Sequence, residues 1–348
     1  MKRVLLVILA LVSVLRAVSA QDFSRRAMLE NITNNIILPS NDALLESIAI
    51  LQTAVVAFQA DPSEDALVTM QDAWKASLLA WQPASLVGLR DVMSIHYRIF
   101  KWPTKEEFIE KFIAGEDILD ARFAVGQGSN SVGLPAMEYL IFHPDGNEAV
   151  LDTFVESPRR ADYLMALADD LVSNATQLQQ YWQVQAPYFA ALDGDGSSLS
   201  SGVSVVTNEL LANLEGQAKV RIGVPLGIDD GDPRPMESVS RRSEMSIPQI
   251  RAHIVASPRL FNGGDGLGLD DYLASIGQDD LIVTINSIFD DMIANLDLVT
   301  LPLEQAVVDE HEQVLAVYDC YKDVVRYMKA DMTQQLGISV AFNESDGD

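Results

Sequence analysis

One acidic side chain, Glu138, stands inside an otherwise apolar stretch that runs from Gly133 to Phe142. Gly133 and Pro135 suit the start of a helix, and the apolar residues that follow recur at helical spacing. This spacing predicts that Glu138 lies on or beside a buried face. An ionised carboxylate is costly there unless a cation, a hydrogen-bond donor or an ion-pair partner compensates its charge.

Two arginines are candidate partners for Glu138. Arg98 lies in an aromatic setting that includes Trp102, and Arg221 lies two residues after Lys219. An arginine can bind a carboxylate through two parallel hydrogen bonds, so either pair could lock two parts of the fold together. The same residues could instead line a pocket for an organic or sugar ligand. Both interpretations remain open from the sequence.

A metal site would need several ligands that converge on one ion, usually imidazole for zinc or iron and carboxylate for harder ions. The chain contains 4 histidines, none of them four residues from another. We interpret His143 as a turn residue and His311 as a structural residue on a core stripe. A site of oxygen ligands remains open, with Glu138 as the first metal ligand and carboxylates of the second half or of the tail at 343–348 as the others.

Motifs for hydrolysis are missing from the sequence. Hydrolysis needs a polarising ion or an activated nucleophile. The chain has no His-Glu-x-x-His and no Gly-x-Ser-x-Gly, and its single cysteine, Cys320, has no histidine near it in the sequence. We therefore predict no catalytic residue, and we expect Cys320 to fill a small space in the core.

The overall charge limits the partners that the chain can bind. The formal net charge is −26, and it becomes about −29 without the first 20 residues, when 21 Lys and Arg face 50 Asp and Glu. Such a surface repels nucleic acid and anionic membranes at long range and attracts cations. We therefore expect no nucleic-acid partner.

The first residues have the pattern of a secretory signal. Lys2 and Arg3 precede the apolar run Val4–Leu15, and small residues stand before Gln21. This pattern predicts a signal peptide at 1–20 that is cleaved after Ala20, and an exported, periplasmic protein that is not a lipoprotein. We expect no membrane span, because no later segment of about 20 residues is free of charge.

Amphipathic stripes predict helices along most of the chain. Stripes cover 44–58, 67–81, 164–182, 203–214, 281–296 and 307–336, and we expect Asp61 to cap the second of these helices. The polar segment 229–242 is a loop long enough to cover something. The only candidate strand is 338–342. Antiparallel helices with short turns predict an all-α fold of two packed helical bundles, with domains at 21–192 and 193–348.

The segment Gly133-Leu134-Pro135-Ala136-Met137-Glu138 resembles the signature of the imelysin-like family, Gly-x-His-x-x-Glu, with Pro135 at the histidine position. The segments 97–103, 219–227 and 336–348 support the resemblance. In that family the His and Glu are thought to form a metal or catalytic site. The resemblance implies two helical-bundle domains with a site at their junction, and it implies a role near metal or iron acquisition.

We therefore expect an exported binding protein that takes up a small ligand or a cation at the junction, where the cofactor candidates are a divalent cation or iron. The residues expected at the site are Glu138, Gly133, Pro135, Arg98, Trp102, Lys219 and Arg221. Two alternatives remain: a metal-dependent peptidase of the imelysin type, which Pro135 disfavours because proline offers no ligand atom, and a non-catalytic scaffold with an envelope protein partner.

Overall fold

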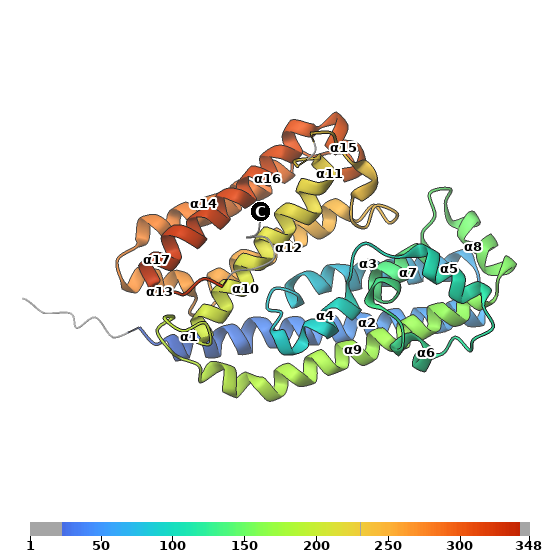
Figure 1. The fold of residues 1–348 in the computed structure, drawn as a ribbon, viewed down its shortest axis with the longest axis horizontal. Coiled ribbons are helices and arrows are strands. Elements are labelled where there is room, and N and C mark those ends of the chain that lie inside the picture. Colours follow the sequence, from blue (N-terminus) through green and yellow to red (C-terminus); the bar gives the residue numbers. More distant parts are fainter. Residues whose placement is uncertain (1–22, 230, 342–348) are drawn as a thin grey trace, which may run out of the picture.

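The structure is a computed structural model that describes residues 23–229 and 231–341. The expected signal peptide and the acidic tail from residue 342 lie outside the described residues. Within the described ranges the chain is helical and contains no strand, as Figure 1 shows. The all-α prediction is confirmed, and the candidate strand is wrong at 338–341.

The first bundle is built on three long helices. They are α2 (Leu38–Ala60), α3 (Glu64–Ala84) and α9 (Arg159–Ala190). The apolar stripe of α2 packs against both α3 and α9, which explains why the chain turns back sharply after Ala60. The cap of α3 is Ser63, whose hydroxyl accepts a hydrogen bond from the N–H of Ala66, and the expected cap at Asp61 is wrong. Ahead of α2 lie α1 (Arg25–Ile32) and a π-helical turn, Thr33–Ile37.

Short helices between α3 and α9 carry the signature segment. Most of them lie along α9, and α7 also contacts α3. They are α4 (Met93–Ile99), α5 (Glu106–Ala114), α6 (Ala121–Val125), α7 (Gly133–Ile141) and α8 (Asn147–Glu156), with 3-10 turns at Arg90–Val92 and Ser129–Ser131.

The second bundle lies above the first in Figure 1 and is coloured yellow to red. Its long helices are α10 (Gly202–Gly216), α12 (Ser246–Phe261), α14 (Asp279–Leu296) and α16 (His311–Arg326). Its short helices are α11 (Val224–Leu226), α13 (Leu269–Ser275), α15 (Leu303–Asp309) and α17 (Thr333–Leu336). Two π-helical segments, Gln217–Gly223 and Tyr327–Met332, extend α10 and α16, and a 3-10 turn covers Pro235–Glu237.

The two bundles share an interface. Helix α12 packs against α3, and polar contacts from α10 tie down the loop that follows α3. The Asn213 side chain donates hydrogen bonds to the carbonyls of Ser85 and Leu86, and a carboxylate oxygen of Glu209 accepts one from the Gly88 N–H at 2.9 Å. Buried apolar residues of both halves form one continuous core. The domain boundary at 192–193 falls in the loop between α9 and α10 and stays a prediction.

In the described part of the chain, one helical run, Arg25–Ala60, is long and apolar enough by composition to cross a membrane. The same property is found in core helices, and α2 packs on two neighbours within the bundle. The expected lack of a membrane span stays a prediction.

Candidate functional site

The signature segment begins at a glycine that no other residue could replace without strain. Gly133 has φ +80°, in the left-handed region, and a Cβ built there would lie 2.4 Å from the carbonyl oxygen of Arg98 and 2.6 Å from that of Ile99. The first turn of α7 therefore presses directly on the end of α4. Gly133 fixes where α7 starts and thus where Glu138, one and a half turns later, points.

Glu138 is buried, as predicted, with 3% of its surface exposed. Its partner comes from the second half of the chain. Ser243 donates twice to Oε1 of Glu138, from the backbone N–H at 3.1 Å and from the hydroxyl at 2.8 Å. Among the described residues, these hydrogen bonds end on Oε1, and Glu138 also lines a small pocket. One oxygen is therefore anchored and the other is available to a ligand.

The loop that carries Ser243 is held in an unusual conformation. Ser240 and Glu244 have φ of +58° and +56°, values that residues other than glycine seldom adopt. Helix α12 fixes the loop from behind, because the Ser246 hydroxyl and the Gln249 amide both donate to the carbonyl of Val239. The sequence predicted that a loop at 229–242 covers something, and the segment just after it lies on Glu138.

The surroundings of Glu138 hold its proton more tightly than water does. Burial raises the pKa of Glu138 to about 7, and the two hydrogen bonds from Ser243 and the positive charges of Arg242 and Arg241 oppose this rise. Desolvation is the larger effect because the side chain is almost fully enclosed. Glu138 can therefore accept or release a proton near neutral pH.

Two adjacent hollows open beside Glu138. The smaller has about 10 Å³ of space, roughly enough for one water molecule, and is lined in part by Trp102, Pro135 and Arg241. The buried hydroxyl of Thr104, also in its wall, has no hydrogen-bond partner among the described residues. The larger hollow measures about 350 Å³ and shares three residues with the smaller one: Glu106, Tyr139 and Arg242.

The larger hollow is lined by alternating charges around a tyrosine. Arg242 pairs with Glu106 at 2.8 Å, and Arg160 binds both oxygens of Glu110 at 2.8 and 3.0 Å. The hydroxyl of Tyr139 donates to Glu110 at 2.7 Å, and both guanidinium groups lie within 6 Å of its ring. This wall is polar and nearly balanced in charge, which suits a small polar molecule rather than an apolar one.

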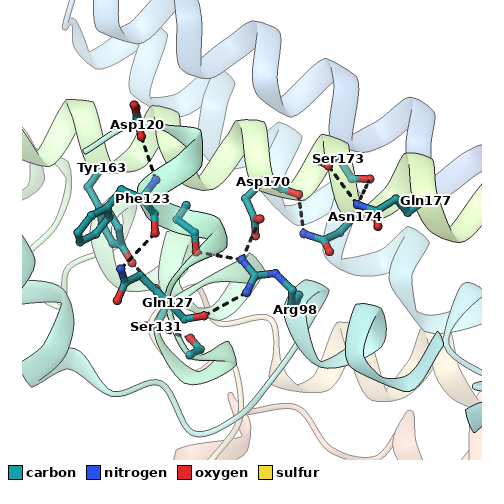
Figure 2. Close-up of polar contacts among 12 residues, drawn as sticks. Arg98, Asp120, Phe123, Gln127, Ser131, Tyr163, Asp170, Ser173, Asn174 and Gln177 are labelled. Carbon is teal, nitrogen blue, oxygen red and sulfur yellow. Dashed lines mark hydrogen bonds and ion pairs between the residues drawn. The ribbon is translucent and has the colours of Figure 1, made fainter. Parts of the chain in front are cut away.

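Arg98 does not pair with Glu138. Its guanidinium donates to Asp170 on α9, at 2.8 Å, and to the carbonyls of Ala124 and Gln127. Figure 2 shows the contacts with Asp170 and Gln127. Asp170 is 1% exposed, so this pair is buried inside the first bundle. Arg98 thereby fixes the loop that leads to the signature segment, and the expected pairing with Glu138 is wrong.

Arg221 also lies away from Glu138. It is buried, its guanidinium donates to the side-chain oxygen of Gln249, and it lies 4.9 Å from the ring centroid of Phe100, in the first half. Burial lowers the pKa of Arg221 to about 10. Lys219 is exposed and lines a different hollow, in the second bundle. The structure therefore brings Pro135, Glu138 and Trp102 together around one small pocket, with Gly133 at the start of the helix that carries Glu138. Arg98, Lys219 and Arg221 do not line this pocket.

The described residues around Glu138 do not fit a metal ion, and the tail at 343–348 that was considered as a source of further ligands lies outside the described residues. In the described ranges, no group of three or more His, Cys, Asp or Glu side chains is placed to hold one. Arg241 and Arg242 line the same pocket as Glu138, and their positive charges would repel a cation. His143 makes a turn contact with Asp145, and His311 binds the carbonyl of Val307, four residues earlier.

Sequence reasoning missed the residues that complete the site. Arg241 and Arg242 end the predicted covering loop at 229–242, and Ser243 follows it, about 100 residues after Glu138. The only sequence signal for them was that this loop could cover something. Tyr139 directly follows Glu138, and Glu106 is one of several charged residues at the start of α5, so neither stands out in the sequence. Asp170 carried a weak signal, because it is an acid on the inner face of a long amphipathic helix.

The fold and the site together define a two-bundle helical protein with a buried carboxylate where the bundles meet. A family model described as imelysin matches residues 37–326. The chain belongs to the imelysin family.

Solved structures support the same fold. An imelysin-like protein from Psychrobacter arcticum 273-4 superposes with a TM-score of 0.77 at 18% identity, over 91% of this chain and 97% of that one. A protein from Parabacteroides distasonis ATCC 8503, described as an iron-regulated protein A precursor, superposes with a TM-score of 0.74 at 18% identity, over 90% and 95%. No curated protein matches the chain.

Proposed function

We propose that the protein is an exported, non-catalytic binding protein that holds a small polar organic ligand at the junction of its two bundles. The observation that carries this proposal is the placement of Glu138. Its Oε1 is anchored by Ser243 from the other half of the chain, while the residue lines a pocket next to a larger polar hollow. A ligand in this place would contact both halves.

The chemistry of the walls indicates which groups the ligand carries. Glu138 accepts a hydrogen bond when it is ionised, so it suits a hydroxyl or amino group. Arg241 lines the same pocket, and among the described residues it makes no ion pair, so it suits a carboxylate. This pocket has room for about one water molecule, so most of the ligand would lie in the adjacent larger hollow and only its polar atoms would reach Glu138 and Arg241. A small hydroxy acid or amino acid carries both groups.

Such a ligand would also be consistent with an iron-related role. One relative in fold is described as an iron-regulated protein A precursor, and the compartment expected from the signal pattern is the periplasm. Hydroxy acids bind ferric iron through their oxygens, as hard cations prefer. On this proposal the protein binds iron as a complex with an organic acid and contributes no metal ligand of its own.

Calorimetric titration of the chain from residue 21 onward tests this, with citrate, ferric citrate and ferrous ion as separate probes. We expect citrate or its ferric complex to bind, and ferrous ion alone not to bind. Arg241→Gln and Glu138→Gln should each weaken binding about tenfold or more, as loss of one charged contact does. Arg251→Gln, which removes an exposed pair with Asp297, is the matched control and should bind normally. Stoichiometric binding of ferrous ion alone, or no binding of either citrate form, would refute the proposal.

Hydrolysis is a second candidate function, and one contact favours it. The Ser243 hydroxyl donates to Glu138, whose pKa is close to 7, and a serine next to a general base can act as a nucleophile. The same hydroxyl also donates to the carbonyl of Ser240 at 3.1 Å, which competes with this role. A protease assay with and without a chelator decides between the two functions. Cleavage that is lost in Ser243→Ala but insensitive to the chelator would establish a serine-dependent hydrolase.

A further inference from the structure

The second bundle contains a separate hollow that the junction site does not use. It measures about 310 Å³ and lies between the π-helical segment Gln217–Gly223 and α16, two elements that pack against each other. Short π-helical segments occur frequently at functional sites because they displace side chains from the regular helical register. All of the residues that line this hollow belong to the second half of the chain.

The floor of the hollow is apolar and includes an aromatic ring. Tyr318 is partly buried, and a Cβ at Gly223 would lie 3.1 Å from its ring. Gly223 thus lets the ring lie directly against the backbone of the π-helical segment. The remaining apolar lining is Ala218, Ile228 and Val325. This surface can pack against one face of a small ring.

The rim carries an excess of positive charge, in a chain whose net charge is −26. Lys219, Lys322 and Arg326 line the hollow, together with two acids, Glu215 and Asp229. Glu215 is bound by Lys329 at 2.9 Å, which offsets its charge, and Arg326 contacts Asp323 at 3.2 Å. The Nζ atom of Lys322 lies 5.6 Å from the ring centroid of Tyr318, so one cation is placed directly over the apolar floor.

We infer that this hollow is a binding site for a small aromatic or cyclic carboxylate. The ring of such a ligand would lie against Tyr318 and the π-helical backbone, and its carboxylate would lie between Lys219 and Lys322. A cationic ligand of the same shape would be repelled by the rim. A carboxylate without a ring would lack the apolar contact.

Ligand-detected NMR with benzoate tests this site in the chain from residue 21 onward, with benzylammonium and acetate as comparison probes. Benzoate should bind, benzylammonium should not, and acetate should bind more weakly. The variant Lys219→Glu/Lys322→Glu should weaken benzoate binding at least about tenfold. Raised salt should also weaken it, since the attraction is partly electrostatic.

Matched controls separate this site from other causes. Lys105→Glu/Lys111→Glu makes the same change in net charge at α5 and should leave benzoate binding unchanged. Arg241→Gln should also leave it unchanged, which distinguishes this site from the junction. The inference is overturned if benzoate does not bind, if benzylammonium binds as well as benzoate, or if the Lys219 and Lys322 variant binds benzoate normally while it remains folded by circular dichroism.

Discussion

Ser243 places its backbone N–H and its hydroxyl on the same oxygen of Glu138, across 105 residues of sequence. The acid belongs to the first bundle and its donor to a loop that α12 of the second bundle holds in place. The state of Glu138 therefore depends on the docking of the two halves.

The stability of the protein should fall as the pH rises through the range in which Glu138 loses its proton. Its pKa is raised from 4.5 to about 7. Between these values the folded state keeps a proton that the unfolded state has released, so unfolding becomes easier with rising pH. Above pH 7 the free energy of unfolding should be lower by about 3 kcal/mol than it is below pH 4.5, as far as Glu138 contributes. Glu138→Gln should lack this part of the slope.

Urea unfolding at several pH values checks this prediction. The pKa of Glu209 is also raised to about 7, by burial, so the variant should keep a slope from that residue. The difference in unfolding free energy between the two proteins reports on Glu138 alone. A difference that stays constant with pH would contradict the prediction.

Removing the Ser243 hydroxyl should make Glu138 harder to ionise. Ser243→Ala deletes a hydrogen bond that lowers the pKa of Glu138, so the midpoint of its titration should move to higher pH. The free energy of unfolding should drop by about 1–2 kcal/mol above that midpoint. The pH dependence of stability measures both. Ser275→Ala removes an exposed hydroxyl that is bonded within its own helix. As the control, it should change neither the titration midpoint of Glu138 nor the free energy of unfolding.

Gly133→Ala should be far more damaging than an alanine at another glycine with positive φ. Gly146 has φ +91°, and a Cβ added there would meet no atom within 4 Å, so Gly146→Ala should cost only the conformational strain, about 1–3 kcal/mol. Gly133→Ala adds a clash with the carbonyls of Arg98 and Ile99 and should cost at least about 2 kcal/mol more. Thermal and urea unfolding of both variants give the comparison. Equal losses would mean that the backbone yields easily at Gly133.

The Arg98–Asp170 pair should behave as a buried ion pair that is costly to break. Arg98→Met leaves Asp170 buried without its partner and should destabilise the fold by about 3–5 kcal/mol. Adding Asp170→Leu removes the stranded charge, so the double variant should be more stable than Arg98→Met alone. Equilibrium unfolding of the single and double variants tests this. Additive losses would show that the two side chains act independently.

The sequence predicted most of the fold because helices are encoded locally. The stripe at 67–81 defines the buried face of α3, and its helix ends at Ala84, next to the Pro83 that breaks the pattern. The N-cap of α3 was predicted wrongly because Asp61 and Ser63 are both good capping residues, and only the geometry of the turn selects between them.

The site was predicted only in part because its contacts are not local. The burial of Glu138 follows from its neighbours in the helix, but Ser243 is a serine among several in a polar loop. The two arginines were assigned to Glu138 for the same reason, whereas Arg98 pairs with Asp170 and Arg221 donates to the amide oxygen of Gln249. Arg98 is close to Glu138 in sequence, while Asp170, its partner, is 72 residues away on α9.

The left-handed backbone at Ser240 and Glu244 places conformational strain in the loop that contacts Glu138. A conformation that most side chains avoid persists only while neighbouring contacts hold it, and here those are the bonds of Ser243 to Glu138 and the bonds of α12 to Val239. Separation of Ser243 from its acid removes one of these two supports. Relatives that carry glycine or asparagine at these two positions would adopt the same backbone conformation with less strain. Their loop would therefore detach from the carboxylate less readily.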